Sequence, residues 1–256
     1  MNLPKAVAGT LARYLSAVDA SRPGLVEGLY VTGSVALDAY RPGRSDIDTV
    51  IVTSRPLGAG DIEPVRAAHT GFDGVYLDRE TFDRFPADQP VVPFVVGGEL
   101  VTDRPCGELH PVLWLLLARH GIGVRGPAPA ELAIPFDAAA LRRYNLTNLH
   151  EYWEPLAAQV RAATDGVDDG ESVPADSVDW MILGPGRLHY TLAYEAIVGK
   201  PGVAAYLGEF FPQWSDLAER AVRWRAGEEA AFTVRDLRAA ADAAAAVIAD
   251  ADRRFG

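Results

Sequence analysis

The first half of the chain alternates between apolar positions at helical spacing and short, continuous apolar runs. A helix is predicted at residues 4–20, where one face carries Val7, Leu11, Leu15 and Val18. Three apolar runs predict buried strands at residues 25–33, 47–54 and 72–82. A helix is predicted at 61–71, with Pro64 near its start, and a buried helix at 108–121. The run 91–101 is expected at a sheet edge, because Pro93 cannot donate to a strand ladder.

The second half has almost no strand pattern and is rich in Ala, Leu, Arg and Glu. Helices are predicted between glycines and prolines, at residues 138–163, 177–198, 201–208, 213–226 and 233–253. A polar, acidic loop interrupts them near residues 165–176. The pattern therefore predicts two domains, an α/β or α+β domain at 1–137 and an α-helical domain at 138–256.

Composition and charge exclude several classes of protein. Hydrophobic residues make up 49% and charged residues 23% of the 256 residues, which is typical of a globular domain. The formal net charge of −11 leaves no basic footprint for nucleic acid and favours cationic partners. No apolar run has the length of a membrane span, and the N-terminus lacks the apolar centre of a signal peptide. Because Cys106 is the single cysteine, we expect a cytoplasmic protein without internal disulfides. We also expect a monomer.

A pair of aspartates at the start of a predicted strand suggests chemistry. Asp46 and Asp48 flank Ile47, so both carboxylates point to the same face of the strand. Two like charges this close need a positive partner, and oxygen ligands favour Mg²⁺. The preceding turn carries Gly33 and Ser34, which suit close approach of a phosphate. Each feature alone is common by chance; their order along the chain is more specific.

The segment "GSVALDAYRPGRSDID", residues 33–48, resembles the signature of nucleotidyltransferases with the polymerase-β-type fold. The chain further resembles the aminoglycoside adenylyltransferases that modify streptomycin and spectinomycin. A fainter match is "LGPGRLHYTLAYEAIVGKPGVA", residues 183–204, which has an arginine on a helix and a lysine thirteen positions later. The resemblance implies an α+β fold, with a mixed sheet flanked by helices followed by a helical bundle.

The resemblance also implies which residues bind ATP and Mg²⁺. Asp46 and Asp48 would hold the metal. The phosphates would be contacted by Gly33, Ser34, Arg44, Ser45, Arg187 and Lys200, with ATP bridging the two domains. Without the resemblance, Arg44, Arg187 and Lys200 would be ordinary surface charges.

The resemblance implies a third carboxylate, which is a metal neighbour and the general base for the acceptor hydroxyl. The family uses a glutamate, and the matching position here holds Asp73, whose side chain is one methylene shorter. The family closes on its drug with aromatic and acidic groups, for which the candidates are Glu151, Trp153, Asp176, Asp179 and Trp180. The acidic stretch 165–179 could equally be a solvated loop. Trp114, in an apolar helix, is expected in the core rather than on a drug.

The predicted function is Mg²⁺-dependent transfer of AMP from ATP to a hydroxyl of an aminoglycoside-type antibiotic, which would confer resistance. Two alternatives stay open. One is a regulatory or antitoxin-like module that binds a nucleotide without turnover. The other is a nucleotidyltransferase that acts on a different acceptor. An intact set of three carboxylates in an open, acidic site favours an enzyme, and a buried or basic site favours a module.

Overall fold

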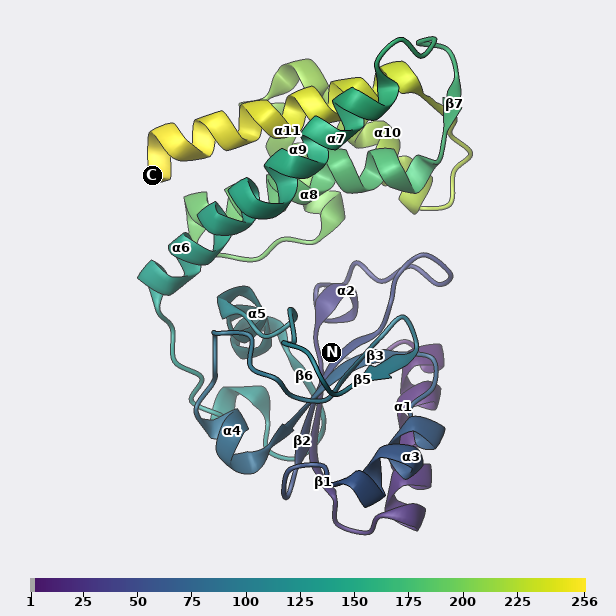
Figure 1. Cartoon of the computed structure of the whole chain (residues 1–256), viewed down its shortest axis with the longest axis vertical. Coiled ribbons are helices and arrows are strands. Elements are labelled where there is room, and N and C mark those ends of the chain that lie inside the picture. Colours follow the sequence, from purple (N-terminus) through teal and green to yellow (C-terminus); the bar gives the residue numbers. More distant parts are fainter. Residues whose placement is uncertain (1–2) are drawn as a thin grey trace. The chain divides into compact units, whose positions relative to one another are not determined.

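The computed structural model describes residues 3–256 and divides into two compact units (Figure 1). The first unit ends at Phe136, and the second runs from Asp137 to Gly256. The first is a mixed sheet with helices and the second is helical, as the α+β prediction requires. Each unit has its own apolar core and is described by itself below.

The sheet of the first unit has six strands in the order β5-β4-β3-β2-β1-β6. Their bounds are β1 Val26–Val31, β2 Asp48–Thr53, β3 Asp73–Asp78, β4 Phe94–Val96, β5 Glu99–Val101 and β6 Ile122–Arg125. Strands β2 and β3 are parallel, because helix α3 (Ala59–Ala68) returns the chain to the same end of the sheet. The other neighbours pair antiparallel. The sheet is therefore mixed, and its one parallel pair joins the strands that carry the predicted carboxylates.

Helices cover both faces of this sheet (Figure 1). Helix α1 (Lys5–Ser21) packs with α3 on one face, and α4 (Arg79–Asp83) with α5 (Pro111–His120) on the other. Trp114 of α5 is buried, and its indole Nε1 donates to the Pro86 carbonyl at 2.9 Å. Its predicted place in the core is confirmed. Helix α1 buries Tyr14 where the spacing suggested Leu15, which is only partly buried.

Two features of the first unit differ from the sequence prediction. The sequence of residues 34–40 predicts two helical turns, but α2 spans only Gly33–Ala36 and ends before Asp38, whose φ is +53°. Strand β6 was not predicted, because its Ile-Gly-Val-Arg sequence is short and lacks alternation. It forms by pairing with the edge of β1, a long-range contact that local sequence cannot show.

The second unit consists mainly of α-helices. Their bounds are α6 Ala138–Asn148, α7 Glu154–Thr164, α8 Ala175–Tyr194, α9 Lys200–Phe210, α10 Ser215–Arg225 and α11 Val234–Phe255. A π-helical turn, Leu149–Trp153, joins α6 to α7 and makes the single helix predicted at 138–163. Short 3₁₀ turns lie at Pro129–Glu131 in the first unit and Pro212–Trp214 in the second. A two-residue ladder, β7 (Ser172–Val173) with β8 (Phe232–Thr233), was not predicted.

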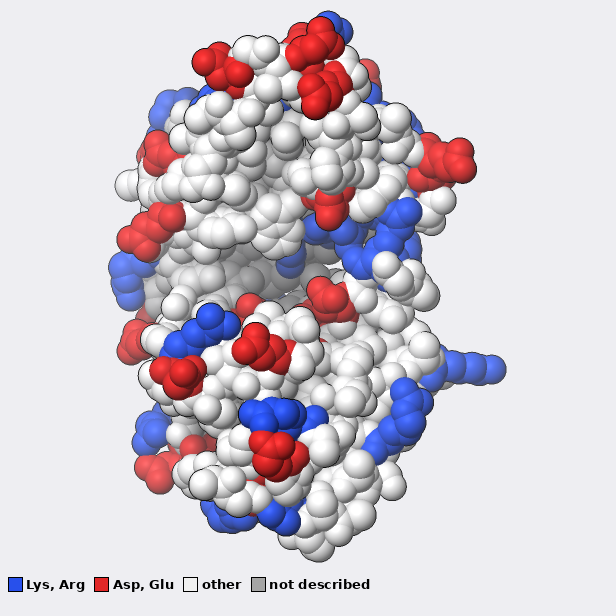
Figure 2. Space-filling view, turned by 45° about the vertical axis from the view of Figure 1, so that its right-hand side comes forward, with Lys and Arg blue, Asp and Glu red and all other residues white. Residues whose placement is uncertain are grey.

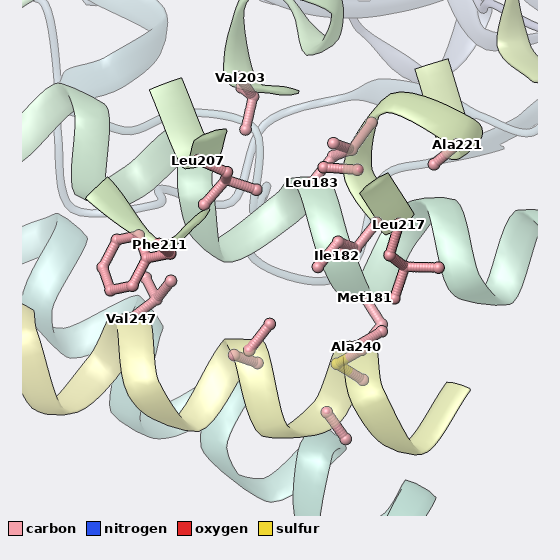
Figure 3. Packing of buried hydrophobic residues seen from close by; sticks show 14 of the residues in the cluster. Met181, Ile182, Leu183, Val203, Leu207, Phe211, Leu217, Ala221, Ala240 and Val247 are labelled. Atoms are coloured by element: carbon pink, nitrogen blue, oxygen red, sulfur yellow. The ribbon is translucent and has the colours of Figure 1, made fainter. Parts of the chain in front are cut away.

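Helix α8 lies in the core of the second unit, where its apolar residues meet those of α9, α10 and α11 (Figure 3). Two glycines let other elements approach it closely. A Cβ at Gly184 would lie 2.0 Å from the Trp153 ring, and one at Gly186 would lie 2.7 Å from Val203 Cγ1. Glycine here removes the side chain that would keep the helices apart. The small residues that flank Pro185 therefore serve packing.

The surface drawn in Figure 2 carries separate groups of acidic and of basic side chains, and the largest blue group lies at mid-height on the right. Within residues 3–256, no helix is long and apolar enough to cross a bilayer.

Candidate active site

The backbone brings Asp48 and Asp73 side by side. They are directly paired in the parallel β2–β3 ladder. The Asp73 amide donates to the Ile47 carbonyl at 2.8 Å, and Thr49 Oγ1 donates to the Asp73 carbonyl at 2.9 Å. The Thr32 amide donates to the Asp48 carbonyl at 2.9 Å, which ties the turn before α2 to the same place. The relative positions of these aspartates are thus fixed by main-chain hydrogen bonds.

The three candidate carboxylates share one face of the sheet. Ile47 is buried while its neighbours Asp46 and Asp48 are exposed and half-buried, which is the alternation expected of a strand. Because Asp73 is the direct partner of Asp48, it projects to that same face. The negative charge of Asp46 acts on Asp73. The structure therefore places Asp73 next to Asp48, with Asp46 near enough for its charge to act on Asp73.

Gly33 is required beside Asp48 for two independent reasons. Its φ is +57°, a backbone conformation that costs an L-residue energy. A Cβ at this position would lie 1.7 Å from Asp48 Oδ2, well inside any real contact. The main chain of the Gly-Ser turn therefore packs directly against the carboxylate.

Ser34 presents a buried hydroxyl that lacks a hydrogen-bond partner among the described residues. A buried polar atom without a partner is costly, and it is a good position for a ligand oxygen. Ser45 closes the following loop: its amide donates to the Arg41 carbonyl at 2.9 Å, and its Oγ accepts from the Arg41 amide at 3.1 Å. Arg44 lies exposed in that loop.

A tight turn between β4 and β5 holds the Asp73 carboxylate. Gly97 and Gly98 both have positive φ, +57° and +81°, which is the conformation of a two-residue hairpin of the type I′ class. Their amides donate to Asp73 and lower its pKa. Loss of solvent raises the pKa of Asp73 more strongly, and the charge of Asp46 raises it further. Asp73 thus has a raised pKa and is a better proton acceptor than an ordinary aspartate.

In the second unit, Arg187 and Lys200 are also close to one another, since the charge of Arg187 lowers the pKa of Lys200. Asp179, a predicted substrate residue, is instead buried beneath Lys200. Its Oδ2 lies 2.5 Å from Lys200 Nζ and 2.9 Å from a guanidinium nitrogen of Arg225. Arg187 is partly exposed on α8, the helix that carries Asp179. Of the two predicted phosphate-binding cations, Lys200 therefore pairs with a buried carboxylate, which it shares with Arg225.

The predicted aromatic substrate residues take different positions. Trp153 is buried against Gly184, so it forms part of the core. Trp180 is exposed, packs on Trp153 with ring centroids 5.3 Å apart, and donates through Nε1 to the Tyr152 hydroxyl at 3.0 Å. Lys200 Nζ lies 5.2 Å from the centroid of the Trp180 ring. Trp180 is therefore the aromatic side chain at the cation cluster that is open to a ligand.

The predicted acidic substrate residues also separate. Glu151 and Asp176 are exposed and available to a ligand. In the acidic stretch, Asp169 pairs with Arg235 and Arg238 of α11 and so has a structural role. Contact of Glu151, Trp153, Asp176, Asp179 or Trp180 with an acceptor stays a prediction, and the structure favours the exposed members of that set.

Comparison with known proteins supports this site. Residues 11–89 match the family model described as "Nucleotidyltransferase domain". The first unit therefore contains a nucleotidyltransferase domain over these residues. No curated protein matches the chain by sequence. A structural neighbour is the crystal structure of spectinomycin adenyltransferase AAD(9) from Enterococcus faecialis with ATP and spectinomycin, with 15% identity and a TM-score of 0.68. The match covers 94% of this chain and 98% of the neighbour.

These matches confirm two predictions about the nucleotidyltransferase. The chain is an enzyme of that class, and its α+β fold extends through the helical unit, since the neighbour is covered almost completely. The predicted resemblance is thereby confirmed for the nucleotidyltransferase domain and for the fold. At this identity, the neighbour's ligands belong to the neighbour alone.

The residues of the nucleotidyltransferase suit a divalent cation. As the side chains stand, no three Asp, Glu, His or Cys residues within 3–256 converge tightly enough to hold a metal. Asp48 and Asp73 are nevertheless paired in adjacent strands, the charge of Asp46 raises the pKa of Asp73, and the Gly33 main chain packs directly against Asp48. A cation would relieve this crowding of negative charge, and hard oxygen donors suit Mg²⁺. The donor set fits the predicted metal.

The sequence prediction missed two features near the carboxylates of the first unit and one feature of the cation cluster in the second unit. The Gly97–Gly98 turn that holds Asp73 was predicted only as edge structure. Glu108 is exposed, yet its pKa is raised by loss of solvent and by the charge of Asp73, so it belongs to the electrostatic surroundings of the site. Arg225 shares Asp179 with Lys200. A Gly-Gly pair between apolar triplets could have indicated the turn; no local signal marks Glu108 or Arg225.

Proposed function

We propose that this nucleotidyltransferase transfers AMP from ATP to a hydroxyl group of an aminoglycoside-type antibiotic, in a reaction that depends on Mg²⁺. The observation that carries the proposal is that Asp48 and Asp73 are paired in adjacent strands beside the Gly33–Ser34 turn, with Asp46 two residues before Asp48. Asp48 is the first residue of β2 and pairs with Asp73 of β3, and Asp46 lies two residues before β2. Three carboxylates and an unpartnered buried hydroxyl form a site for a metal and a phosphate.

Asp73 has the properties of the general base. Its raised pKa brings it closer to the range in which a carboxylate both stays ionised and accepts a proton. It would take the proton of the acceptor hydroxyl, whose oxygen attacks the α-phosphorus as the bond to the β-phosphate breaks and pyrophosphate leaves. The amides of Gly97 and Gly98 keep its carboxylate oriented during this step. Mg²⁺ held by the three carboxylates would supply charge neutralisation for the phosphates.

Each unit offers its own set of residues to the phosphates. The first unit offers Ser34, Ser45 and Arg44, of which Ser34 has a hydroxyl still lacking a partner among the described residues. The second offers Lys200, which is paired with Asp179, and Arg187, whose charge acts on Lys200. Both sets supply what a polyanion requires, namely hydrogen-bond donors and positive charge.

A cationic, hydroxyl-rich acceptor is supported by three observations. The neighbouring fold, crystallised with spectinomycin and ATP, covers nearly the whole chain. The net charge of −11 favours encounter with a cation. The exposed Trp180 offers a flat apolar surface, with Glu151 and Asp176 as acceptors for ammonium groups. Antibiotic resistance follows if the modified drug no longer binds its target.

The proposal is tested by incubating the protein with ATP, Mg²⁺ and a panel of aminoglycosides that includes streptomycin and spectinomycin. The expected result is one acceptor with the mass of an added AMP, together with stoichiometric pyrophosphate. Chelation with EDTA should abolish transfer, and added Mg²⁺ should restore it. ATP binding without transfer to any acceptor on the panel would instead indicate a different acceptor or a module without turnover.

Matched variants locate the site. Asp46→Asn and Asp73→Asn should each lower kcat/KM by at least about 100-fold, because each removes a charged contact in the reacting centre. Asp83→Asn is the control, since Asp83 is an exposed aspartate in α4, beyond the opposite end of β3. It should leave kcat/KM unchanged. Full activity in both site variants would place the reaction elsewhere. Loss in Asp46→Asn alone would keep the metal site and remove Asp73 as the base.

A further inference from the structure

One carboxylate oxygen in the second unit is shared by two cations from different helices. Asp179 Oδ2, on α8, lies 2.5 Å from Lys200 Nζ at the start of α9 and 2.9 Å from a guanidinium nitrogen of Arg225 at the end of α10. The side chain of Asp179 is 3% exposed, and those of Lys200 and Arg225 are 14% and 15% exposed. Asp179 therefore fixes the relative position of two cationic groups far apart in sequence.

The cluster carries more positive than negative charge. Two cations face a single carboxylate, and Arg187 is close enough to lower the pKa of Lys200 further. Burial has the largest effect and lowers the pKa of Lys200, while Asp179 raises it. Partly buried cations lose hydration, and one shared carboxylate compensates for only one of the two charges. An incoming anion would supply the remaining compensation.

The second oxygen of the same carboxylate does not help to hold the cations. Asp179 Oδ1 is buried and has no hydrogen-bond partner among the described residues. A carboxylate placed only for stability would satisfy both oxygens, because an unsatisfied buried oxygen is costly. Both cations instead converge on Oδ2, and Trp180 faces Lys200 from another side at 5.2 Å. The arrangement holds Lys200 and Arg225 close together.

We propose that Asp179 is a positioning residue that holds Lys200 and Arg225 as a pair, and that Arg225 is a further phosphate-binding residue of the enzyme. The ligand is the polyphosphate part of the nucleotide, so the inference rests on the proposed function. Arg225 binds phosphate through its guanidinium donors, and Asp179 acts through the two cations without touching the ligand. Asp179 would thus not be the substrate contact that the sequence suggested.

The experiment measures binding of inorganic tripolyphosphate and of ATP to the full chain by titration calorimetry. Arg225→Gln should weaken tripolyphosphate binding about 10- to 100-fold, the range for loss of a hydrogen bond to a charged group. Arg225→Lys should recover part of that loss, because it keeps the charge without the planar fork. The matched control is Arg223→Gln on the same helix, where Arg223 is exposed and lies beside Glu219 and Glu228. It should bind as the wild type does.

Asp179→Asn separates positioning from simple electrostatics. Removal of a negative charge should strengthen anion binding if charge alone matters. Positioning predicts the opposite: Lys200 and Arg225 repel each other, separate, and bind tripolyphosphate about tenfold more weakly. In steady-state kinetics the KM for ATP should rise, while the KM for the acceptor stays near the wild-type value. Should this variant fail to fold, the Arg225 series still decides the assignment.

Three outcomes overturn the inference. The first is that tripolyphosphate fails to bind the wild type, and the second is that Arg225→Gln binds it as tightly as Arg223→Gln does. The third is that folded Asp179→Asn binds tripolyphosphate at least as tightly as the wild type. These outcomes are distinct from failure of the proposed function. If the wild type transfers AMP while the variants bind normally, only the inference fails. If tripolyphosphate binding follows the predicted pattern but no aminoglycoside is modified, only the acceptor is wrong.

Discussion

Gly33→Ala adds one atom, a Cβ, beside the site, and its effect depends on what that Cβ would contact. The new Cβ would lie 1.7 Å from Asp48 Oδ2, whereas real Cβ atoms essentially never approach within 3.0 Å. The carboxylate must therefore withdraw by about 1.3 Å, the difference between these distances. The positive φ of +57° adds a backbone cost of about 1–2 kcal/mol for any L-residue.

This displacement is large relative to the tolerance of the site. Mg²⁺–oxygen bonds are about 2.0–2.1 Å and tolerate errors of only about 0.2 Å. A misplacement of about 1 Å costs on the order of 100-fold in rate. We expect Gly33→Ala to lower kcat/KM at least about 100-fold, while the free energy of unfolding falls by only about 1–2 kcal/mol.

The assay pairs AMP transfer with urea denaturation, and Gly24→Ala is the matched control. Gly24 also has a positive φ, +74°, but a Cβ added there would have no atom within 4 Å, and the residue precedes the opposite end of β1. It should lose similar stability and keep full activity. If Gly33→Ala retains wild-type kcat/KM, or if both variants lose activity equally, then the contact with Asp48 does not govern catalysis.

Two further predictions concern stability. The ring of His69 is buried, accepts a hydrogen bond from the Tyr76 hydroxyl and donates one to the Phe72 carbonyl. Burial lowers its pKa to about 4. Because the unfolded chain then binds a proton more readily than the folded one, stability should fall as the pH drops from about 6.5 toward 4. The free energy of unfolding in urea should lose about 2 kcal/mol more between pH 7 and 5 in the wild type than in His69→Gln; equal slopes would contradict this. Gly184→Ala would place its Cβ 2.0 Å from the ring of Trp153, so we expect a lower Tm and a free energy of unfolding reduced by about 1–2 kcal/mol. The control is Gly9→Ala in α1, whose Cβ would meet only the end of the Arg13 side chain at 3.6 Å and which should stabilise the protein. A raised Tm for Gly184→Ala would disprove the packing argument.

The local features of the site could be predicted from sequence. The spacing of Asp46 and Asp48 predicts that they share a face, because a strand has a period of two; Asp48 begins β2 and Asp46 lies two residues before it. Gly33 and Ser34 precede them by a short loop, so their proximity follows from a short chain connection. The helices of the second unit were predictable because an apolar periodicity of 3.6 is a local property.

The remainder depended on contacts between segments distant in sequence. Asp73 reaches Asp48 through the parallel register of β2 and β3, and the Gly97–Gly98 amides reach Asp73 through two further strands. Arg225 meets Asp179 only because α8 and α10 pack together. Burial likewise decided that Asp179 is held between cations while Trp180 stays exposed, although the two are adjacent in sequence. Sequence fixes what each residue can do and how it relates to near neighbours. Which distant groups share a site is decided by packing, since charge and hydration act through distances in space.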